Sequence, residues 1–253
     1  MNREDFSNGF DTLVSSFAHR YNFGDETSLA DVAFDEYEKS FFLTKAQESL
    51  VIAMYNGGAG NSFEETEEMR RYLANLVVDA TLTPKDKHIN SGVSSNSKFF
   101  DLPLDDNDNS LIWFITYEAV SVDGIENCDS LGSLDVIPVT QDEYHKIKKN
   151  PFRGANYRRA LRLDLPNNQI EIVCKKNITS YYVRGLRKPK PIILIDLPDG
   201  LTVDNESKAS DPACELHEAL HNRILEAAVL MALQSKGYTR GSNDNKETKQ
   251  RSN

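Results

Sequence analysis

The stretch that decides the fold class runs from Ala160 to Val173 and reads ALRLDL-PNN-QIEIV. Apolar residues alternate with polar ones on both sides of Pro166-Asn167-Asn168. Alternation with a period of two is typical of a strand with one buried face. Proline followed by two asparagines is typical of a turn. The stretch therefore predicts two antiparallel strands joined by a short turn.

Further strands are expected on both sides of this hairpin. They span 111–117, 134–139, 181–184 and 192–195, where β-branched and aromatic residues are frequent. Thr140, with Glu143 three residues later, predicts the start of a short helix over 140–149. We expect residues 111–210 to form an antiparallel β region that includes this helix.

The N-terminal part, residues 1–82, is expected to be helical. The apolar residues that recur at three- and four-residue spacing are Phe10, Leu13, Val14 and Phe17, then Leu50, Val51, Met54 and Tyr55, and then Met69, Tyr72, Leu73, Leu76, Val77 and Ala80. Thr44 with Gln47, and Ser62 with Glu65, have the spacing of a capping box. Gly57 is expected to end the second of three helices, because glycine adopts a left-handed C-cap without strain.

A long C-terminal helix is expected over 211–237. Asp211 would cap it, Pro212 would occupy its first turn, and Gly237 would end it. Its second half is apolar on nearly all sides, so it should be buried, packed back on the N-terminal helices. Residues 83–110 are polar and predict a loop, and residues 238–253 predict a flexible tail. The expected fold class is thus α+β.

The charges of the chain are segregated, although its net charge is -10. Residues 1–70 carry fourteen acidic and five basic side chains, whereas residues 146–190 carry thirteen basic and two acidic ones. The basic block would meet either nucleic acid or an acidic protein surface, such as the N-terminal part of a neighbouring copy. We favour the protein surface, because the acidity of the whole chain opposes binding to free DNA.

The sequence also predicts where the protein resides. The N-terminus lacks the basic and apolar regions of a signal peptide, and no apolar run reaches the roughly 18 residues that cross a bilayer. Its three cysteines are far apart and odd in number, as expected in a reducing compartment. We expect a protein made in the cytoplasm, with no membrane partner and no cofactor.

One motif has the form of a catalytic site. His217-Glu218-Ala219-Leu220-His221 matches H-E-x-x-H, in which two histidines on one helical face hold zinc and the glutamate activates water. A zinc hydrolase is therefore one alternative function. The residues after His221 offer neither a glycine turn with a third histidine nor a glutamate on a later helix, so we favour a structural role for the motif.

Several stretches, taken in order, resemble the neck and connector ring proteins of crAss-like podoviruses. They are DEYEKSFFLTKAQE at 35–48, YNG at 55–57, SFEETEE at 62–68, NPFR at 150–153, Arg158-Arg159, YYVRG at 181–185, KPKPIIL at 188–194, and the segment from Cys214 through His221 to Val229. The resemblance covers most of residues 35–233 and is weak at both ends and over 83–110.

The resemblance implies a structural, non-enzymatic protein of the virion. Such a protein forms a closed ring of twelve copies next to the portal, conducts genomic DNA and provides a docking seat for tail components. The residues expected to contact acidic neighbours or channel DNA are Arg153, Arg158, Arg159, Arg184, Arg187 and Lys188. The residues expected at subunit contacts are Glu64, Glu65, Glu67, Glu68, Leu230 and Leu233, together with the C-terminal helix and tail. A nucleic-acid-binding module that uses the 146–190 block is the second alternative function.

Overall fold

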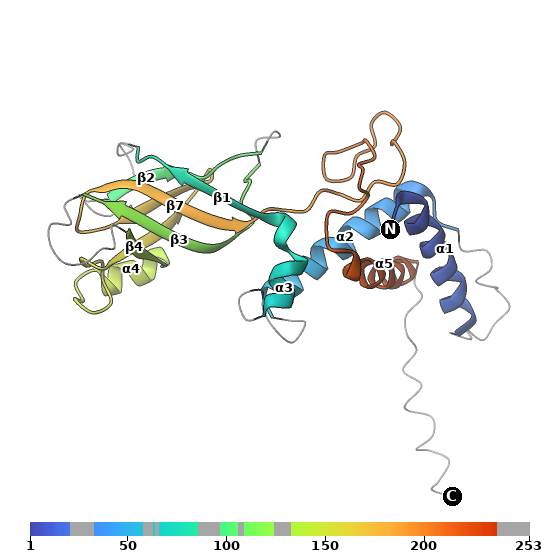
Figure 1. The fold of residues 1–253 in the computed structure, drawn as a ribbon, viewed down its shortest axis with the longest axis horizontal. Helices are drawn as coiled ribbons and strands as arrows, with labels where there is room; N and C mark the ends of the chain where they lie inside the picture. Colours follow the sequence, from blue (N-terminus) through green and yellow to red (C-terminus); the bar gives the residue numbers. More distant parts are fainter. Residues whose placement is uncertain are drawn as a thin grey trace, which may run out of the picture. The chain divides into compact units, whose positions relative to one another are not determined.

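A computed structural model gives the α+β fold that the sequence predicts, in two compact units (Figure 1). It describes residues 1–20, 33–57, 63, 66–85, 97–105, 109–123 and 133–236. The first unit, called here the helical unit, comprises Met1–Asn75 and Pro189–Asn253. The second, called the β unit, comprises Leu76–Lys188. The chain passes from one unit to the other twice.

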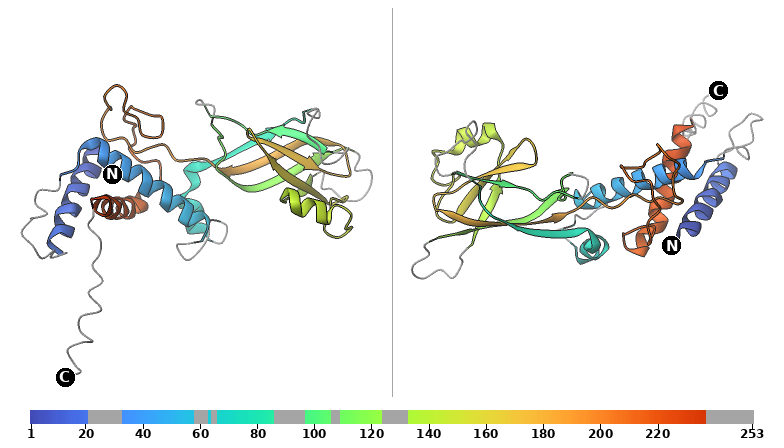
Figure 2. Two further views of the ribbon diagram at one scale, coloured as in Figure 1. Left: turned by 180° about the vertical axis from the view of Figure 1, so that it is seen from behind. Right: turned by 90° about the horizontal axis from the view of Figure 1, so that it is seen from above.

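The helical unit is built on α1 (Arg3–Arg20), α2 (Glu36–Tyr55) and α5 (His221–Ser235). Helix α5 packs against both α1 and α2, as Figures 1 and 2 show, which confirms the expected packing of the C-terminal helix. The side chains buried at these contacts are Phe6, Phe10 and Val14 of α1, Leu43, Ala46, Val51 and Met54 of α2, and Ile224, Leu225, Ala228, Val229, Ala232 and Leu233 of α5.

Helix α2 begins earlier than the sequence indicated. Asp35 caps it, with the Glu38 amide 2.7 Å from the Asp35 carboxylate and the Glu38 carboxylate accepting from the Asp35 amide at 3.2 Å. The capping box expected at Thr44 and Gln47 is wrong, because both residues lie in the interior of the helix. The helix ends at Asn56 and is followed by Gly57, whose φ of 75° confirms the predicted glycine end.

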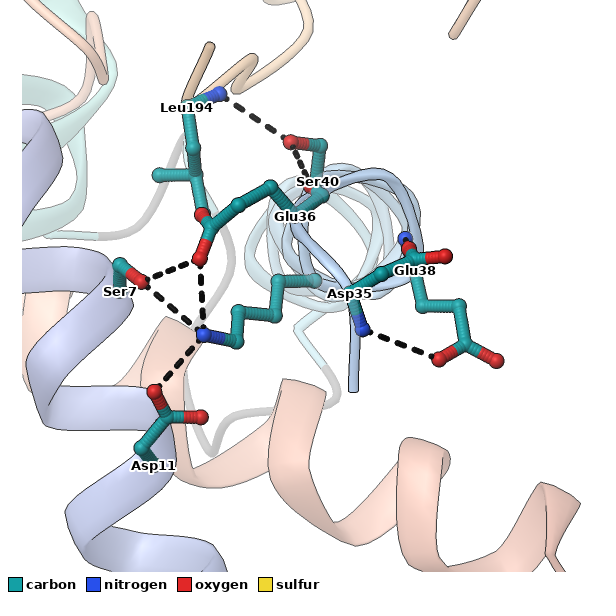
Figure 3. Close-up of polar contacts among 8 residues, drawn as sticks. Ser7, Asp11, Asp35, Glu36, Glu38, Ser40 and Leu194 are labelled. Carbon is teal, nitrogen blue, oxygen red and sulfur yellow. Dashed lines mark hydrogen bonds and ion pairs between the residues drawn. The ribbon is translucent and has the colours of Figure 1, made fainter. Parts of the chain in front are cut away.

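Lys39 joins α1 to α2 through Ser7, Asp11 and Glu36, which Figure 3 labels. Its ammonium lies 2.7 Å from the Asp11 carboxylate, 2.9 Å from the Glu36 carboxylate and 3.0 Å from the Ser7 hydroxyl. Burial by itself would lower the pKa of Lys39, but the hydrogen bonds and charges of Asp11 and Glu36 raise it above its ordinary value. The charged form is therefore the one that the structure stabilises, which explains how a lysine is buried here.

Residues 192–195 were expected to form a strand, but they and the residues just before them belong to no sheet. The backbone of the segment 190–194 hydrogen-bonds instead to buried side chains of α2. The bonds run from Gln47 Nε2 to Lys190 O (2.8 Å), from Ile192 N to Thr44 Oγ1 (3.0 Å) and from Leu194 N to Ser40 Oγ (3.1 Å). A helix rises about 6 Å over four residues, and an extended chain advances about 6.6 Å over two. About every fourth residue of α2 can therefore reach every second residue of this segment.

The β unit contains one sheet of seven strands. The curl of this sheet is visible in both views of Figure 2. The strands are β1 (Val77–Leu82), β2 (Ser97–Asp101), β3 (Phe114–Val122), β4 (Ser133–Pro138), β5 (Arg159–Leu165), β6 (Gln169–Val173) and β7 (Ile178–Leu186), in the order β1-β7-β3-β4-β5-β6-β2. Neighbours pair antiparallel except β4 and β5, which are parallel. The purely antiparallel pairing that was expected is wrong at this one place.

The parallel pair follows from α4 (Gln141–Ile147), which lies between β4 and β5 in the chain. Thr140 caps it, accepting from the Glu143 amide at 3.2 Å, which confirms the predicted helix start. Parallel neighbours require a crossover connection, and α4 provides it. Its buried Tyr144 and Ile147 pack on Leu161 and Leu163 of β5. Helix α4 thereby covers one part of the outer face of the sheet.

The hairpin from which the fold class was predicted is confirmed as β5 and β6. Leu165 pairs with Gln169, and Asn167 and Asn168 between them both have a φ of 59°. Asparagine tolerates this left-handed region better than most residues. The strands Phe114–Val122, Ser133–Pro138 and Ile178–Leu186 likewise confirm expected strands, with bounds that shift by a few residues.

Two expected helix bounds are wrong. The third helix, α3 (Glu67–Tyr72), does not continue to Ala80, because residues 77–82 form β1 and pair with β7. The C-terminal helix begins at His221 and not near Pro212. Residues 214–215 instead make tertiary contacts, in which the Cys214 thiol donates to Gln47 at 3.2 Å and the Glu215 carboxylate accepts from the Lys190 amide at 3.0 Å. Among the described residues, no helix has the length and apolarity to cross a membrane.

The inside of the curled sheet holds a buried ionic cluster. Arg162 of β5 donates to the Glu118 carboxylate of β3 at 2.7 Å, and the Tyr181 hydroxyl of β7 donates to the same carboxylate at 2.8 Å. Arg162 also lies 3.0 Å from Asp164. Burial would lower the pKa of Arg162, but Glu118 and Asp164 raise it; burial also raises the pKa of Glu118 and of Tyr181. The cluster links β5, β3 and β7 across the interior.

Candidate functional site

The H-E-x-x-H stretch does not have the helical geometry that the zinc motif requires. His217 precedes a short 3-10 helix, Glu218–Leu220, and accepts from the Ala219 amide at 3.2 Å through Nδ1. His221 is the first residue of α5, so the two histidines do not share the helical face that the motif requires. In the part of the chain that the structure describes, no three histidine, cysteine or acidic side chains gather where they could hold a metal ion.

His221 has a structural role instead. Its ring is buried and contacts Phe6 of α1, with centroids 5.3 Å apart. Nε2 donates to the Leu216 carbonyl at 3.1 Å, which leaves Nδ1 to accept from the Met1 ammonium at 3.0 Å. This arrangement holds the start of α1 against the start of α5, and it requires the neutral imidazole.

The stability of the helical unit should depend on pH through His221. Burial, with the nearby Met1 ammonium, lowers the pKa of His221 below its ordinary value. The unfolded chain then binds the proton more readily, so this stability is present above pH ~6.5 and is lost as the pH falls. We expect the Tm of the wild type to fall between about pH 7 and pH 5. His221→Gln should remove this part of the slope, whereas exposed His145→Gln should keep it; equal slopes for all three proteins would contradict the assignment.

The six basic residues expected at contacts fall into two groups in the sheet. Arg153 and Arg158 lie in the segment before β5 and Arg159 is its first residue, whereas Arg184, Arg187 and Lys188 lie near and after the end of β7. Strands β3 and β4 separate β5 from β7. Charge alone therefore does not define one continuous surface.

The first group lies beside two aromatic residues that were not among the predicted contact residues. Phe152 is 84% exposed and Tyr157 is 65% exposed, the largest values among the exposed large hydrophobic residues of the described chain. A signal was present, because Pro151 and Gly154 flank Phe152 and predict a turn, where a side chain has little chance of burial. The segment 150–158, called here the 150–158 loop, combines exposed rings with exposed cations.

The acidic residues expected at subunit contacts lie only partly within the described chain. Glu67 and Glu68 are on α3, whereas Glu64 and Glu65 lie outside the described residues. Glu67 pairs with Arg71 at 2.7 Å and Glu68 accepts from the Tyr72 hydroxyl at 2.6 Å. These four side chains and His217 line a shallow cavity of about 410 Å³, called here the Tyr72–His217 cavity.

The two leucines expected at subunit contacts differ. Leu230 is 41% exposed on α5 and remains a candidate for such a contact. Leu233 is 6% exposed and belongs to the core of the helical unit, so it offers no contact surface in this fold. The apolar character of α5 is explained mainly by its packing on two helices, α1 and α2, at once.

The acidic and basic side chains divide unevenly between the two units. Residues 1–75 and 189–253 carry 24 acidic and 14 basic side chains, whereas residues 76–188 carry 15 of each. The helical unit therefore holds all of the net negative charge. The exposed cations of the β unit and the acidic surface of the helical unit are complementary, which suits contacts between identical copies.

The family model described as phage tail ring protein 3/4 matches residues 1–245. The chain belongs to this family. It is 41% identical to "Ring protein 3" of Bacteroides phage crAss001 over 252 residues, which cover 96% of this chain and all of that protein. It is also 28% identical to "Ring protein 4/5" of the same phage over 244 residues, 92% of each chain. The resemblance to ring proteins of crAss-like phages is thereby confirmed.

Proposed function

We propose that the protein is a structural subunit of the virion that forms a closed ring next to the portal, in the head-to-tail connector. The ring would have twelve copies, conduct genomic DNA through its centre and seat the neighbouring tail or ring proteins. The proposal places the protein in the host cytoplasm during assembly and in the connector afterwards. Its relatives are named ring proteins, and this is the observation on which the proposal rests.

The distribution of charge supports a ring of identical copies. A ring arises when one surface of a subunit meets a different surface of the next and the rotation closes. Such a contact requires two complementary surfaces on one chain. The acidic helical unit and the cationic 150–158 loop of the β unit supply two surfaces of this kind.

The ring is tested with the purified full-length protein, alone and with the portal protein. We expect native mass spectrometry to give one closed oligomer and electron-microscopy class averages to show a ring with a central channel. Purified virions should contain the protein in the same copy number. A protein that stays monomeric with the portal present, and that is absent from virions, contradicts the proposal.

Binding to DNA is a second candidate function, favoured by the exposed aromatic rings among cations at 152–158. It predicts an affinity for DNA that falls steeply with salt and that weakens when Arg158 and Arg159 are both replaced by glutamine. The net charge of -10 opposes this function for the isolated subunit, so we place the basic residues at a protein contact.

A further inference from the structure

The 150–158 loop presents two aromatic rings to solvent. Phe152 is the most exposed large hydrophobic residue of the described chain, at 84%, and Tyr157 follows at 65%. Lys175 lies over the Tyr157 ring, with its ammonium 5.6 Å from the ring centroid. Exposed aromatic side chains that gather at one place mark surfaces for interaction.

The loop is held in one shape by its own polar groups. The Asn150 side-chain oxygen accepts from the amides of Phe152 at 2.9 Å and Arg153 at 3.2 Å. The Arg159 guanidinium donates to the Phe152 carbonyl at 3.0 Å. A Cβ on Gly154 would lie 2.7 Å from the Asn150 carbonyl oxygen, so the turn is as tight as glycine permits. A preorganised loop loses little conformational entropy when it binds, which favours its use as an anchor.

The charges around the rings indicate the chemistry of the partner. Arg153 and Arg158 are exposed beside Phe152 and Tyr157. Within the described chain, these two arginines form one ion pair, in which the Glu143 carboxylate lies 3.1 Å from Arg153. The partner should therefore combine a hollow for an aromatic ring with negative charge at its rim.

The Tyr72–His217 cavity of the helical unit has this combination. The Tyr72 and His217 rings contact each other, with centroids 5.3 Å apart, and both line the shallow cavity. Glu67 stands at the rim with 72% of its side chain exposed, and its ion pair with Arg71 is equally exposed. An exposed pair of this kind contributes little to stability, so Glu67 is free to exchange Arg71 for an incoming arginine.

The structure assigns Phe152 as the anchor of the contact between copies, inserted in the Tyr72–His217 cavity of a second copy of the chain. Arg153 and Arg158 then face Glu67 and Glu68 across the contact. This inference rests on the proposed ring function and names the two surfaces that close the ring. A contact with DNA would leave the acidic cavity without a role, whereas a second copy satisfies both surfaces at once.

A photo-cross-linker at position 152 tests the contact directly. Phe152 is replaced by p-benzoylphenylalanine in the full-length protein, which is mixed with an isotope-labelled wild type before illumination. We expect cross-links from the variant to labelled peptides that contain residues 67–72 or 215–218. Cross-links to DNA, to another protein or within one copy overturn the inference, and so does a ring in which position 152 gives no cross-link.

Variants test the same contact by affinity. Phe152→Ala is expected to raise the Kd of association about 30-fold, as for the central residue of an interface. Leu104→Ala, another exposed apolar residue of the β unit, is the matched control and should leave the Kd unchanged within about 2-fold. Circular dichroism should show that both variants remain folded.

A charge exchange separates this inference from the ring function. Arg153→Glu with Arg158→Glu should abolish association, and Glu67→Arg with Glu68→Arg in the partner copies should restore it. If the wild type forms rings, and the Phe152→Ala and charge-reversed variants form them equally well, the anchor is overturned while the ring function stands. Wild-type protein that forms no ring, with portal or without it, overturns both.

Discussion

Replacing Arg162 with methionine is expected to lower the free energy of unfolding by about 3–5 kcal/mol. The substitution leaves the Glu118 carboxylate, whose side chain is only 8% exposed, without its partner at 2.7 Å. The Tyr181 hydroxyl remains as a donor but carries no charge to offset the buried carboxylate. Breaking a buried ion pair from one side is therefore far more costly than losing an exposed pair.

Urea denaturation followed by circular dichroism measures this change. Arg184→Met on β7, where the arginine is exposed, is the matched control and should stay within about 0.5 kcal/mol of the wild type. Because burial raises the pKa of Glu118, protonation relieves the unpaired charge, and the deficit of Arg162→Met should shrink as the pH falls. Adding Glu118→Gln should recover part of the loss at neutral pH. An Arg162→Met protein as stable as the wild type would show that the cluster is dispensable.

The double variant Thr44→Val, Gln47→Leu is expected to lose about 2–4 kcal/mol of unfolding free energy. It removes the acceptor of the Ile192 amide and the donor to the Lys190 carbonyl, both at buried or partly buried positions. Each backbone group left without a partner costs about 1–3 kcal/mol. Valine and leucine are close in size to threonine and glutamine. The loss of unfolding free energy therefore reports the missing hydrogen bonds more than a change in packing.

Hydrogen exchange provides a local measurement of the same change. The Ile192 amide should exchange much faster in the double variant than in the wild type, because its partner on α2 is gone. Lys45→Ala, on the same helix with 42% of the lysine side chain exposed, is the control and should change stability by at most about 0.5 kcal/mol. Unchanged protection at Ile192 in the double variant would contradict the role given to Thr44.

Short-range sequence pattern was sufficient to predict an element whose conformation is determined by its own residues. The Ala160–Val173 hairpin, the Thr140 cap of α4 and the apolar face of α1 were all predicted from short-range spacing. In each of these, the alternation, the cap or the turn residues determine the conformation without distant partners. The α+β class follows from such elements.

Short-range sequence pattern gave a wrong prediction where contacts with a distant segment determine the conformation. Ile192–Ile195 has the composition of a strand, yet its amides bond to side chains of α2 that lie about 150 residues earlier. Val77–Ala80 continued a helical apolar face, but β7 was available as a partner and the two valines favour a strand. The placement of His217 on the C-terminal helix was wrong for a similar reason, since Cys214 and Glu215 contact Gln47 and Lys190 and α5 begins only at His221.

The candidate contact surfaces show the same difference between residues that are recognised from local sequence and residues that only the fold brings together. Arg153 and Arg158 could be named from charge because exposed cations need no knowledge of the fold. The Tyr72–His217 cavity could not, because its two rings come from α3 and from a segment about 145 residues later. Leu233 was misplaced because an apolar helix gives no indication from sequence of which of its sides are covered.

The two places where the chain passes between its units lie next to each other. Val77 pairs with Leu186 at the base of β1 and β7, and the Arg187 amide donates to the Leu76 carbonyl at 2.8 Å. The β unit is thus an insertion whose ends meet, so a short linker suffices to close the helical unit after its excision. An exchange of this unit alone would therefore alter the surfaces that the β unit carries and leave the helical unit as it is.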